Sequence, residues 1–115
     1  MKYTHLTYQE IRDAAHQNHL AVVPTGCIEQ QGPHLPVDFD TWFSEKVCNA
    51  ASDKAGSEYG VHSLVLPAIP FGPTPEHRNY RAGYIDFPVD LHDSLVLATL
   101  KSLAEQGFQI GRAHV

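Results

Sequence analysis

The chain is poor in cysteine and in basic residues, and it has no long apolar segment. Its 115 residues contain two cysteines, Cys27 and Cys48, without the Cys-x-x-Cys spacing of a zinc ribbon or a redox motif. The 8 Lys and Arg residues against 13 Asp and Glu residues give a formal charge of −5, and they form no basic run that could bind nucleic acid phosphates. No stretch approaches the roughly 20 apolar residues that a membrane-spanning helix needs. We therefore expect no nucleic acid partner and no membrane contact.

The N-terminus also lacks the apolar segment of a secretory signal. In the reducing compartments of the cell, cysteines remain thiols. We therefore expect a cytoplasmic protein in which Cys27 and Cys48 are buried and reduced. The hydrophobic content of 43% and the charged content of 18% are typical of a folded globular domain. Eight histidines are many for this length, and histidine is the commonest metal ligand in proteins.

Local patterns predict three helices. Thr7 and Glu10 have the spacing of a capping box, which predicts a first helix to about residue 16. N-cap residues and terminal glycines predict the other two. Asp40 and Gly56 predict a second helix over residues 41–54, whose apolar stripe consists of Phe43, Val47, Ala50 and Ala51. Asp90 and Gly107 predict a third helix that reaches residue 106.

Continuous apolar runs predict strands between these helices. Residues 20–24 and 63–69 are typical of strands buried on both faces, and residues 108–110 begin another strand. Residues 84–87 alternate in polarity and predict an extended segment at an edge. Helices that alternate with buried strands indicate an α/β fold with a mainly parallel sheet.

The two loops richest in polar groups follow the two buried strands. Ligands of such folds bind beyond the carboxyl ends of the strands, so we expect residues 26–40 and residues 71–83 to meet at one edge of the sheet. The first loop holds Glu29, His34, Asp38 and Asp40, a mixture of carboxylate and imidazole that suits Zn²⁺ or Mn²⁺. The alternative is a polar surface loop in which Asp40 only caps the next helix.

The second loop offers a hydroxyl, a carboxylate, an imidazole and a guanidinium group. These groups could orient a polar substrate, or they could form a hydrogen-bonded network at the surface. They belong to Thr74, Glu76, His77 and Arg78.

Both loops resemble motifs of the creatininase (creatinine amidohydrolase) family. The first matches P-x-G-x-x-E-Q-H-G-P-H-L-P-x-x-x-D from Pro24 to Asp40, with Gln31 in place of the first histidine. The second matches G-x-S-x-E-H from Gly72 to His77 with Thr74 in place of the serine, and Gly83 follows with Ala82 and Tyr84 in place of the family's Pro and Thr. Order and spacing agree over nearly the whole chain.

The resemblance implies a three-layer α/β/α fold and an amidohydrolase that cleaves a C–N bond with two divalent ions, Zn²⁺ and/or Mn²⁺. In the family the Glu of the first motif binds one ion, the His binds the other, and the Asp bridges them. Glu29 and Asp40 would then be metal ligands. Gln31 occupies the position of the ligand His, and its neutral amide oxygen is a weaker ligand than imidazole.

The resemblance also assigns supporting roles and a substrate class. His34, Thr74, Glu76 and His77 would bind substrate or hold the ligands in place. The expected reaction is attack of a metal-activated water on a small, possibly cyclic, non-peptide amide in an enzyme that forms homo-oligomers. An alternative is a non-catalytic family member that binds a small molecule and lacks the dinuclear site. A third, an α/β domain that holds an anion at a helix N-terminus, is disfavoured by the carboxylates in the first loop.

The last residues predict that the chain is incomplete. In the family a strand and an N-G-H-x-x-N motif with the remaining ligands follow, but residues 110–115 read Ile-Gly-Arg-Ala-His-Val, which does not suit a buried strand. The codons ATC-GGA-AGA-GCA-CAC-GTC, the start of a common sequencing adapter, encode the same residues. We expect residues 1–109 to be the N-terminal part of a creatininase-family domain, residues 110–115 to be a non-native tail, and the chain as written to be an inactive fragment whose catalytic residues are missing. Source DNA with any other codons after Gln109 would contradict this expectation.

Overall fold

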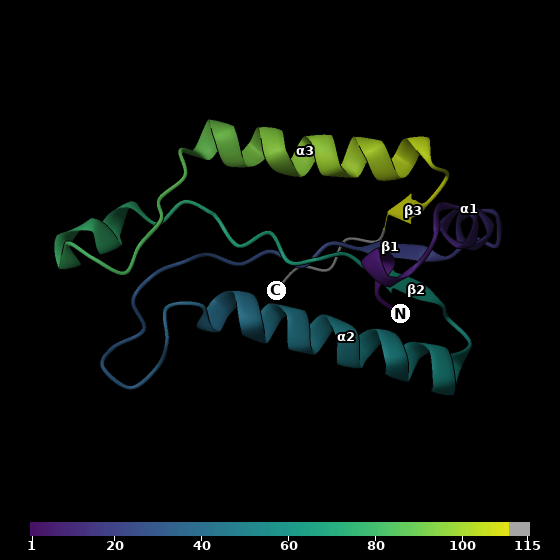
Figure 1. Ribbon diagram of the computed structural model, residues 1–115, viewed down its shortest axis with the longest axis horizontal. Helices are drawn as coiled ribbons and strands as arrows, with labels where there is room; N and C mark the ends of the chain where they lie inside the picture. Colours follow the sequence, from purple (N-terminus) through teal and green to yellow (C-terminus); the bar gives the residue numbers. More distant parts are fainter. Residues whose placement is uncertain (111–115) are drawn as a thin grey trace.

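The computed structural model describes residues 1–110 and shows helices arranged around a small sheet (Figure 1). The predicted tail over residues 110–115 therefore lies outside the described residues, except for Ile110. The elements in chain order are the short 3₁₀ helix η1 (Tyr3–His5), α1 (Tyr8–His16), β1 (Leu20–Val22), α2 (Phe39–Tyr59), β2 (Ser63–Val65), the 3₁₀ helix η2 (Pro75–Tyr80), α3 (Val89–Glu105) and β3 (Gln109–Ile110).

The three strands form a parallel sheet in the order β2-β1-β3. The central strand pairs Ala21 with Leu64 of β2 and Leu20 with Gln109 of β3. Helix α2 lies on one side of the strands and α3 on the other, which gives the expected three-layer α/β/α arrangement (Figure 1). The predicted fold class is confirmed.

The core lies between the sheet, α1 and α3. Helix α1 begins with the predicted capping box, in which the Thr7 hydroxyl accepts from the Glu10 N–H at 3.3 Å and the Glu10 carboxylate accepts from the Thr7 N–H at 3.1 Å. This cap sets the start of the helix so that its alanines face the sheet. The buried residues of the cluster are Ala14, Ala15, Ala21, Leu64, Leu103 and Phe108.

The strands are shorter than predicted. They end at Val22 and Val65, because the prolines that follow, Pro24 and Pro67, have no N–H to donate to a neighbouring strand. Residues 84–87 form no strand but make isolated bridges, Ile85 with Ile28 and Asp86 with Gly72. These bridges fasten the segment to the two polar loops.

Helix α2 differs from the prediction at both ends. It begins at Phe39 after Asp38, so Asp40 is in the first turn and is not the N-cap. It also continues past Gly56 to Tyr59 and ends at Gly60, whose φ of 65° is the left-handed conformation that glycine adopts readily. A single glycine inside a helix lowers the stability of the helix by only about 1 kcal/mol relative to alanine, and the neighbouring turns offset this loss.

The apolar stripe predicted for α2 does not face the sheet. Phe43 and Val47 are 50% and 46% exposed, and Ala50 and Ala51 are exposed as well. The side that packs on β2 carries Ser52, whose hydroxyl shares a buried 2.6 Å hydrogen bond with the Ser63 hydroxyl. The paired serines satisfy each other's polar groups, so a polar helix face can pack against the sheet.

Helix α3 is close to the prediction. It begins at Val89, with Asp90 in its first turn instead of at the N-cap, and it ends at Glu105. Gly107 has a φ of 97° and turns the chain back into β3, which confirms it as the stop. Within residues 1–110, no helix combines the length and apolar character needed to cross a membrane.

The first turn of α2 lies directly against Gly26 in the loop after β1. A Cβ atom on Gly26 would be 2.5 Å from Oγ1 and 2.6 Å from Cα of Thr41, so no other residue fits there without moving the helix. This contact brings Asp40, the neighbour of Thr41, next to the first polar loop.

We expect Gly26→Ala to lower the free energy of unfolding of the protein by about 1–3 kcal/mol, because the added methyl group overpacks a backbone contact. Gly56→Ala is the matched control. Its Cβ would meet His62 at an ordinary 3.5 Å, and alanine in a helix is expected to add about 0.5–1 kcal/mol of stability. Urea denaturation measures both changes. A Gly26→Ala protein as stable as the parent would contradict the packing described here.

Candidate metal centre

The two polar loops meet where β1 and β2 end, as predicted. The Gly26 N–H donates to the Ile69 carbonyl at 2.8 Å, and Thr25 and Ile69 form a parallel bridge beyond the strands. The loop from Gly26 to the start of α2 and the loop around Thr74 therefore run side by side and share contacts.

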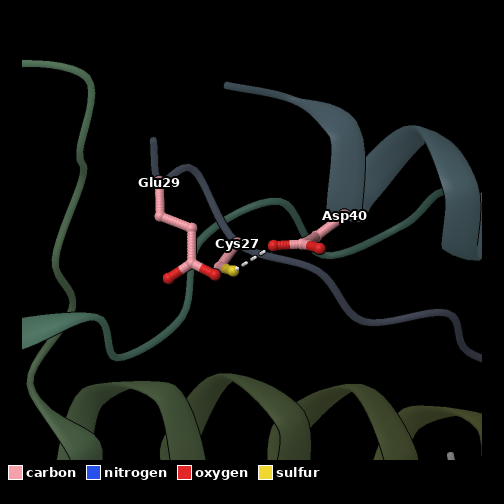
Figure 2. Close-up of side chains that lie close together, drawn as sticks. All are labelled: Cys27, Glu29 and Asp40. Atoms are coloured by element: carbon pink, nitrogen blue, oxygen red, sulfur yellow. Dashed lines mark hydrogen bonds between the residues drawn. The ribbon is translucent and has the colours of Figure 1, made fainter. Parts of the chain in front are cut away.

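One cluster of possible ligands comes from the first loop and α2. The ligand atoms of Cys27, Glu29 and Asp40 all lie within 4.8 Å of one another, and the three side chains point toward a common point (Figure 2). All three residues are half-buried. The predicted ligands Glu29 and Asp40 are thus brought together, and Cys27 joins them.

Asp40 directs its carboxylate at the loop and makes no N-terminal cap. Its Oδ2 accepts from the Cys27 thiol at 3.1 Å and from the Gln31 amide nitrogen at 2.9 Å. Both donors are uncharged. The alternative in which Asp40 only caps the helix is therefore wrong.

Glu29 is held by the second loop. Its Oε2 accepts from the Thr74 hydroxyl at 2.6 Å and lies 3.2 Å from Nε2 of His77. Thr74 is completely buried, so its hydroxyl has a fixed position. Two of the residues expected to support the ligands thus contact the predicted ligand Glu29 directly.

The neighbours of His77 determine which of its nitrogens carries the proton. Oε1 of Gln30 accepts from the Gly32 N–H at 2.8 Å, so the amide nitrogen of Gln30 is the group that faces Nδ1 of His77 at 3.2 Å. Nδ1 therefore accepts, and in the neutral ring the proton is on Nε2, where it is donated to Glu29.

A second cluster consists of Glu29, Glu76 and His77, whose ligand atoms also lie within 4.8 Å of one another. Oε1 of Glu76 is 3.7 Å from Nε2 of His77, and the side chain of Glu76 is 69% exposed. Glu76 is the outermost member of this group, on the solvent side of the site.

An ion pair that was not predicted fixes the second loop. Asp86 accepts from the Thr74 N–H at 2.8 Å and from Nε and Nη2 of Arg78 at 2.9 and 2.8 Å. The hydrogen bond from Thr74 and the contacts with Arg78 lower the pKa of the Asp86 carboxyl below its ordinary value. No periodic pattern in the sequence predicts this contact, because it depends on the turn between the residues.

Cys27 is the other residue whose role sequence reasoning missed. Both cysteines are free, as expected, but they are half-buried and not buried. Burial, together with hydrogen bonds to Asp40 and Glu29 and their negative charges, raises the pKa of the Cys27 thiol above its ordinary value. The neutral thiol is therefore the donor to Asp40. Its position two residues before Glu29 was the available signal.

Two predicted residues are placed differently. Gln31 points its amide nitrogen at Asp40, so its oxygen could bind a metal only after the amide group turns over. His34 is exposed and belongs to neither cluster of the described residues. The structure gives His34 no contact with Glu29 or Asp40, and its supporting role stays a prediction.

The donors in the first cluster fit a divalent metal ion. The two half-buried carboxylates of Glu29 and Asp40 lie side by side, and a divalent cation between like charges relieves their repulsion. Asp40 accepts its hydrogen bonds from a thiol and an amide, which are neutral and do not balance its negative charge. A bound cation would balance that charge. Carboxylate and thiolate are both ligands of Zn²⁺, and carboxylate is also a ligand of Mn²⁺.

Comparison with known proteins places these residues in a family. The sequence profile of the creatininase family, described as creatinine amidohydrolase, matches residues 4–110. The chain belongs to the creatininase family. Both polar loops and all elements from α1 to β3 lie within this match.

Curated relatives in mycobacteria carry the name mycofactocin precursor peptide peptidase. One from Mycobacterium tuberculosis is 32% identical over 87 residues, 72% of this chain and 34% of the relative. One from Mycolicibacterium smegmatis is 33% identical over 61 residues, 53% of this chain and 25% of the relative. The chain thus spans only a quarter to a third of these relatives. Their name describes action on a peptide, so they give no support to the expected restriction to non-peptide bonds.

The contacts of Asp86 predict a pH dependence. A carboxyl with a lower pKa in the folded protein adds stability above its unfolded pKa of about 3.9, and this stability is lost as the pH falls through the folded value. We expect Asp86→Asn to make the protein less stable at neutral pH and to flatten the loss of stability below about pH 4. The stability of Arg78→Gln at neutral pH should lie between the stabilities of Asp86→Asn and the parent protein. Urea denaturation at a series of pH values measures this, and equal acid sensitivity of Asp86→Asn and parent would refute it.

Proposed function

We propose that the full-length protein that contains this chain is a metal-dependent amidohydrolase. The convergence of Cys27, Glu29 and Asp40 at the ends of parallel strands, within a creatininase-family chain, is the observation that supports this. Glu29 and Asp40 would hold the metal from this part of the protein, as the family resemblance implies.

A bound Zn²⁺ or Mn²⁺ lowers the pKa of a coordinated water toward neutrality and polarises the carbonyl of an amide. The contribution of this chain is to hold the carboxylates in place. Thr74 and His77 fix the orientation of Glu29, and the first turn of α2 fixes Asp40. Because the ligands are oriented by residues that are themselves held, little rearrangement is needed to bind the ion.

His77 is suited to hold a proton beside the site. Its Nε2 proton is directed at Glu29, while Gln30 holds the other side of the ring. Cleavage of an amide requires a proton for the departing nitrogen, and histidine is the side chain that most often supplies one near neutral pH. We propose that His77 serves this purpose as the imidazolium: with a second proton on Nδ1, accepted by the Gln30 amide oxygen once the amide turns over, it gives its Nε2 proton to the departing nitrogen and returns to the neutral ring.

The substrate is proposed to be a compound with a C–N amide bond. The family resemblance favours a small, possibly cyclic, non-peptide amide. The name of the mycobacterial relatives favours a peptide, which is the second candidate. A panel of creatinine, other small amides and short peptides, with detection of the released amine, distinguishes the two.

The family resemblance supports a homo-oligomeric assembly, and the two free cysteines support a location in the cytoplasm. A non-catalytic member that binds a small molecule remains the alternative, and Gln31 favours it, because the neutral amide stands where the family has a histidine ligand. Metal content separates the two candidates, since the binding protein would hold no ion.

We expect the purified full-length protein to contain Zn²⁺ or Mn²⁺, and Glu29→Gln to lower its metal affinity more than tenfold, because even residues that only support ligands contribute about 10–100-fold. Glu58→Gln is the matched control. Glu58 is exposed on the last turn of α2, about 27 Å along the helix from Asp40, and should leave the affinity unchanged.

Elemental analysis and titration with a competing chelator measure both variants. Removal of the metal should abolish amide hydrolysis, and its return should restore it. A parent protein without bound metal, or equal affinities for Glu29→Gln and Glu58→Gln, would contradict the proposed function and favour the binding protein.

A further inference from the structure

Cys27 lies next to the position where the chain departs from its family motif. Gln31 stands in place of the histidine, and it turns its amide nitrogen toward Oδ2 of Asp40. An amide NH₂ group donates hydrogen bonds and does not bind metal ions. The same oxygen of Asp40 has a second neighbour, the Cys27 sulfur at 3.1 Å, and a thiolate is a strong ligand.

We propose that Cys27 is a metal ligand of this protein and supplies, as a thiolate, the donor that Gln31 does not provide beside Asp40. The inference rests on the proposed function, because it requires that a divalent ion bind at Glu29 and Asp40. It adds a ligand that the family motif does not contain.

The distances suit a shared ion. Metal–ligand bonds of about 2.0–2.3 Å in a tetrahedral site place neighbouring donor atoms about 3.5 Å apart. The ligand atoms of Cys27, Glu29 and Asp40 lie within 4.8 Å of one another, and the sulfur is 3.1 Å from Asp40. Small side-chain rotations therefore suffice for one ion to contact all three. The ion replaces the thiol proton, which leaves to water.

The backbone of Cys27 is held in place for this role. Gly26, on one side, packs on Thr41, and the Thr41 hydroxyl donates to the Cys27 carbonyl at 3.4 Å. The sulfur and the Asp40 carboxylate are thus both tied to the first turn of α2. Gln31 remains hydrogen-bonded to Asp40 and orients the carboxylate, as groups behind metal ligands commonly do.

A thiolate in place of an imidazole changes which ion the site selects. Imidazole is neutral and thiolate is an anion, so the site gains a negative charge. Sulfur ligands favour Zn²⁺, whereas carboxylate ligands also suit Mn²⁺. We therefore expect the ion that binds next to Asp40 and Cys27 to be Zn²⁺.

Replacement of the bound metal with Co²⁺ tests the inference in the full-length protein. A thiolate bound to Co²⁺ gives an intense charge-transfer band in the near ultraviolet, which oxygen and nitrogen ligands do not give. We expect the parent to show this band and Cys27→Ser to lose it. Serine keeps a hydroxyl donor for Asp40, so a purely structural role of Cys27 would survive the change.

Two further variants complete the experiment. Cys48→Ser is the matched control, because Cys48 is also half-buried but lies about 12 Å along α2 from Asp40, and it should keep the band. Cys27→Ser should bind Zn²⁺ more than about 100-fold more weakly, beyond the range of supporting residues, and lose its preference over Mn²⁺. Adding Gln31→His to Cys27→Ser restores an imidazole and should recover at least tenfold of that affinity.

The outcomes separate the two proposals. A band in the parent that Cys27→Ser loses and Cys48→Ser keeps supports the inference. Co²⁺ bound without the band overturns the role of Cys27 and leaves the proposed function standing. A parent that binds no ion overturns both. The spectrum of the parent needs no variant, so the inference stays testable even if Cys27→Ser fails to fold.

Discussion

The close contact between Gly26 and the first turn of α2 determines the rest of the site. Because Gly26 has no side chain, the backbone of Thr41 can rest against the loop that leaves β1. This contact places the Asp40 carboxylate within reach of Cys27 and Gln31, residues of a loop that would otherwise be free to face the solvent. A carboxylate in the first turn of a helix is common, and here the packing of that turn on Gly26 brings it close to Glu29.

The second loop completes the arrangement through one buried residue. Thr74 donates hydrogen bonds from its hydroxyl to Glu29 and from its N–H to Asp86, so it connects the first polar loop with the segment before α3. Arg78 holds Asp86 from the other side. The position of Glu29 therefore depends on a chain of contacts that includes both loops and the turn of η2. Such a chain fixes a ligand more firmly than a single hydrogen bond does.

Much of the fold could be predicted from the sequence, because capping and hydrophobic patterns are local. Thr7 and Glu10 located α1, and the apolar runs located β1 and β2 and gave the parallel sheet. The boundaries of α2 could not be predicted, since Gly56 is tolerated inside the helix and Gly60 ends it. The face of α2 against the sheet was also missed, because the Ser52–Ser63 pair depends on a contact between distant residues.

The same distinction holds for the site. Glu29 and Asp40 were predicted from a motif, and the structure brings them together. Cys27 was missed as a member of the cluster because its one local signal, the position two residues before Glu29, does not distinguish a thiol beside the carboxylates from a thiol in the core. Asp86 was missed for a similar reason, since its partners Thr74 and Arg78 reach it only through the fold. Contacts between side chains that lie far apart in the sequence could not be predicted, because the fold alone brings them together.

X-ray absorption at the zinc edge, measured on the zinc-loaded full-length protein, tests the central claim most directly. The claim is that the metal centre contains Cys27 as well as the carboxylates of Glu29 and Asp40. The account predicts one sulfur at about 2.3 Å from zinc, beside oxygen or nitrogen neighbours at about 2.0–2.2 Å. A shell of oxygen and nitrogen alone would contradict it.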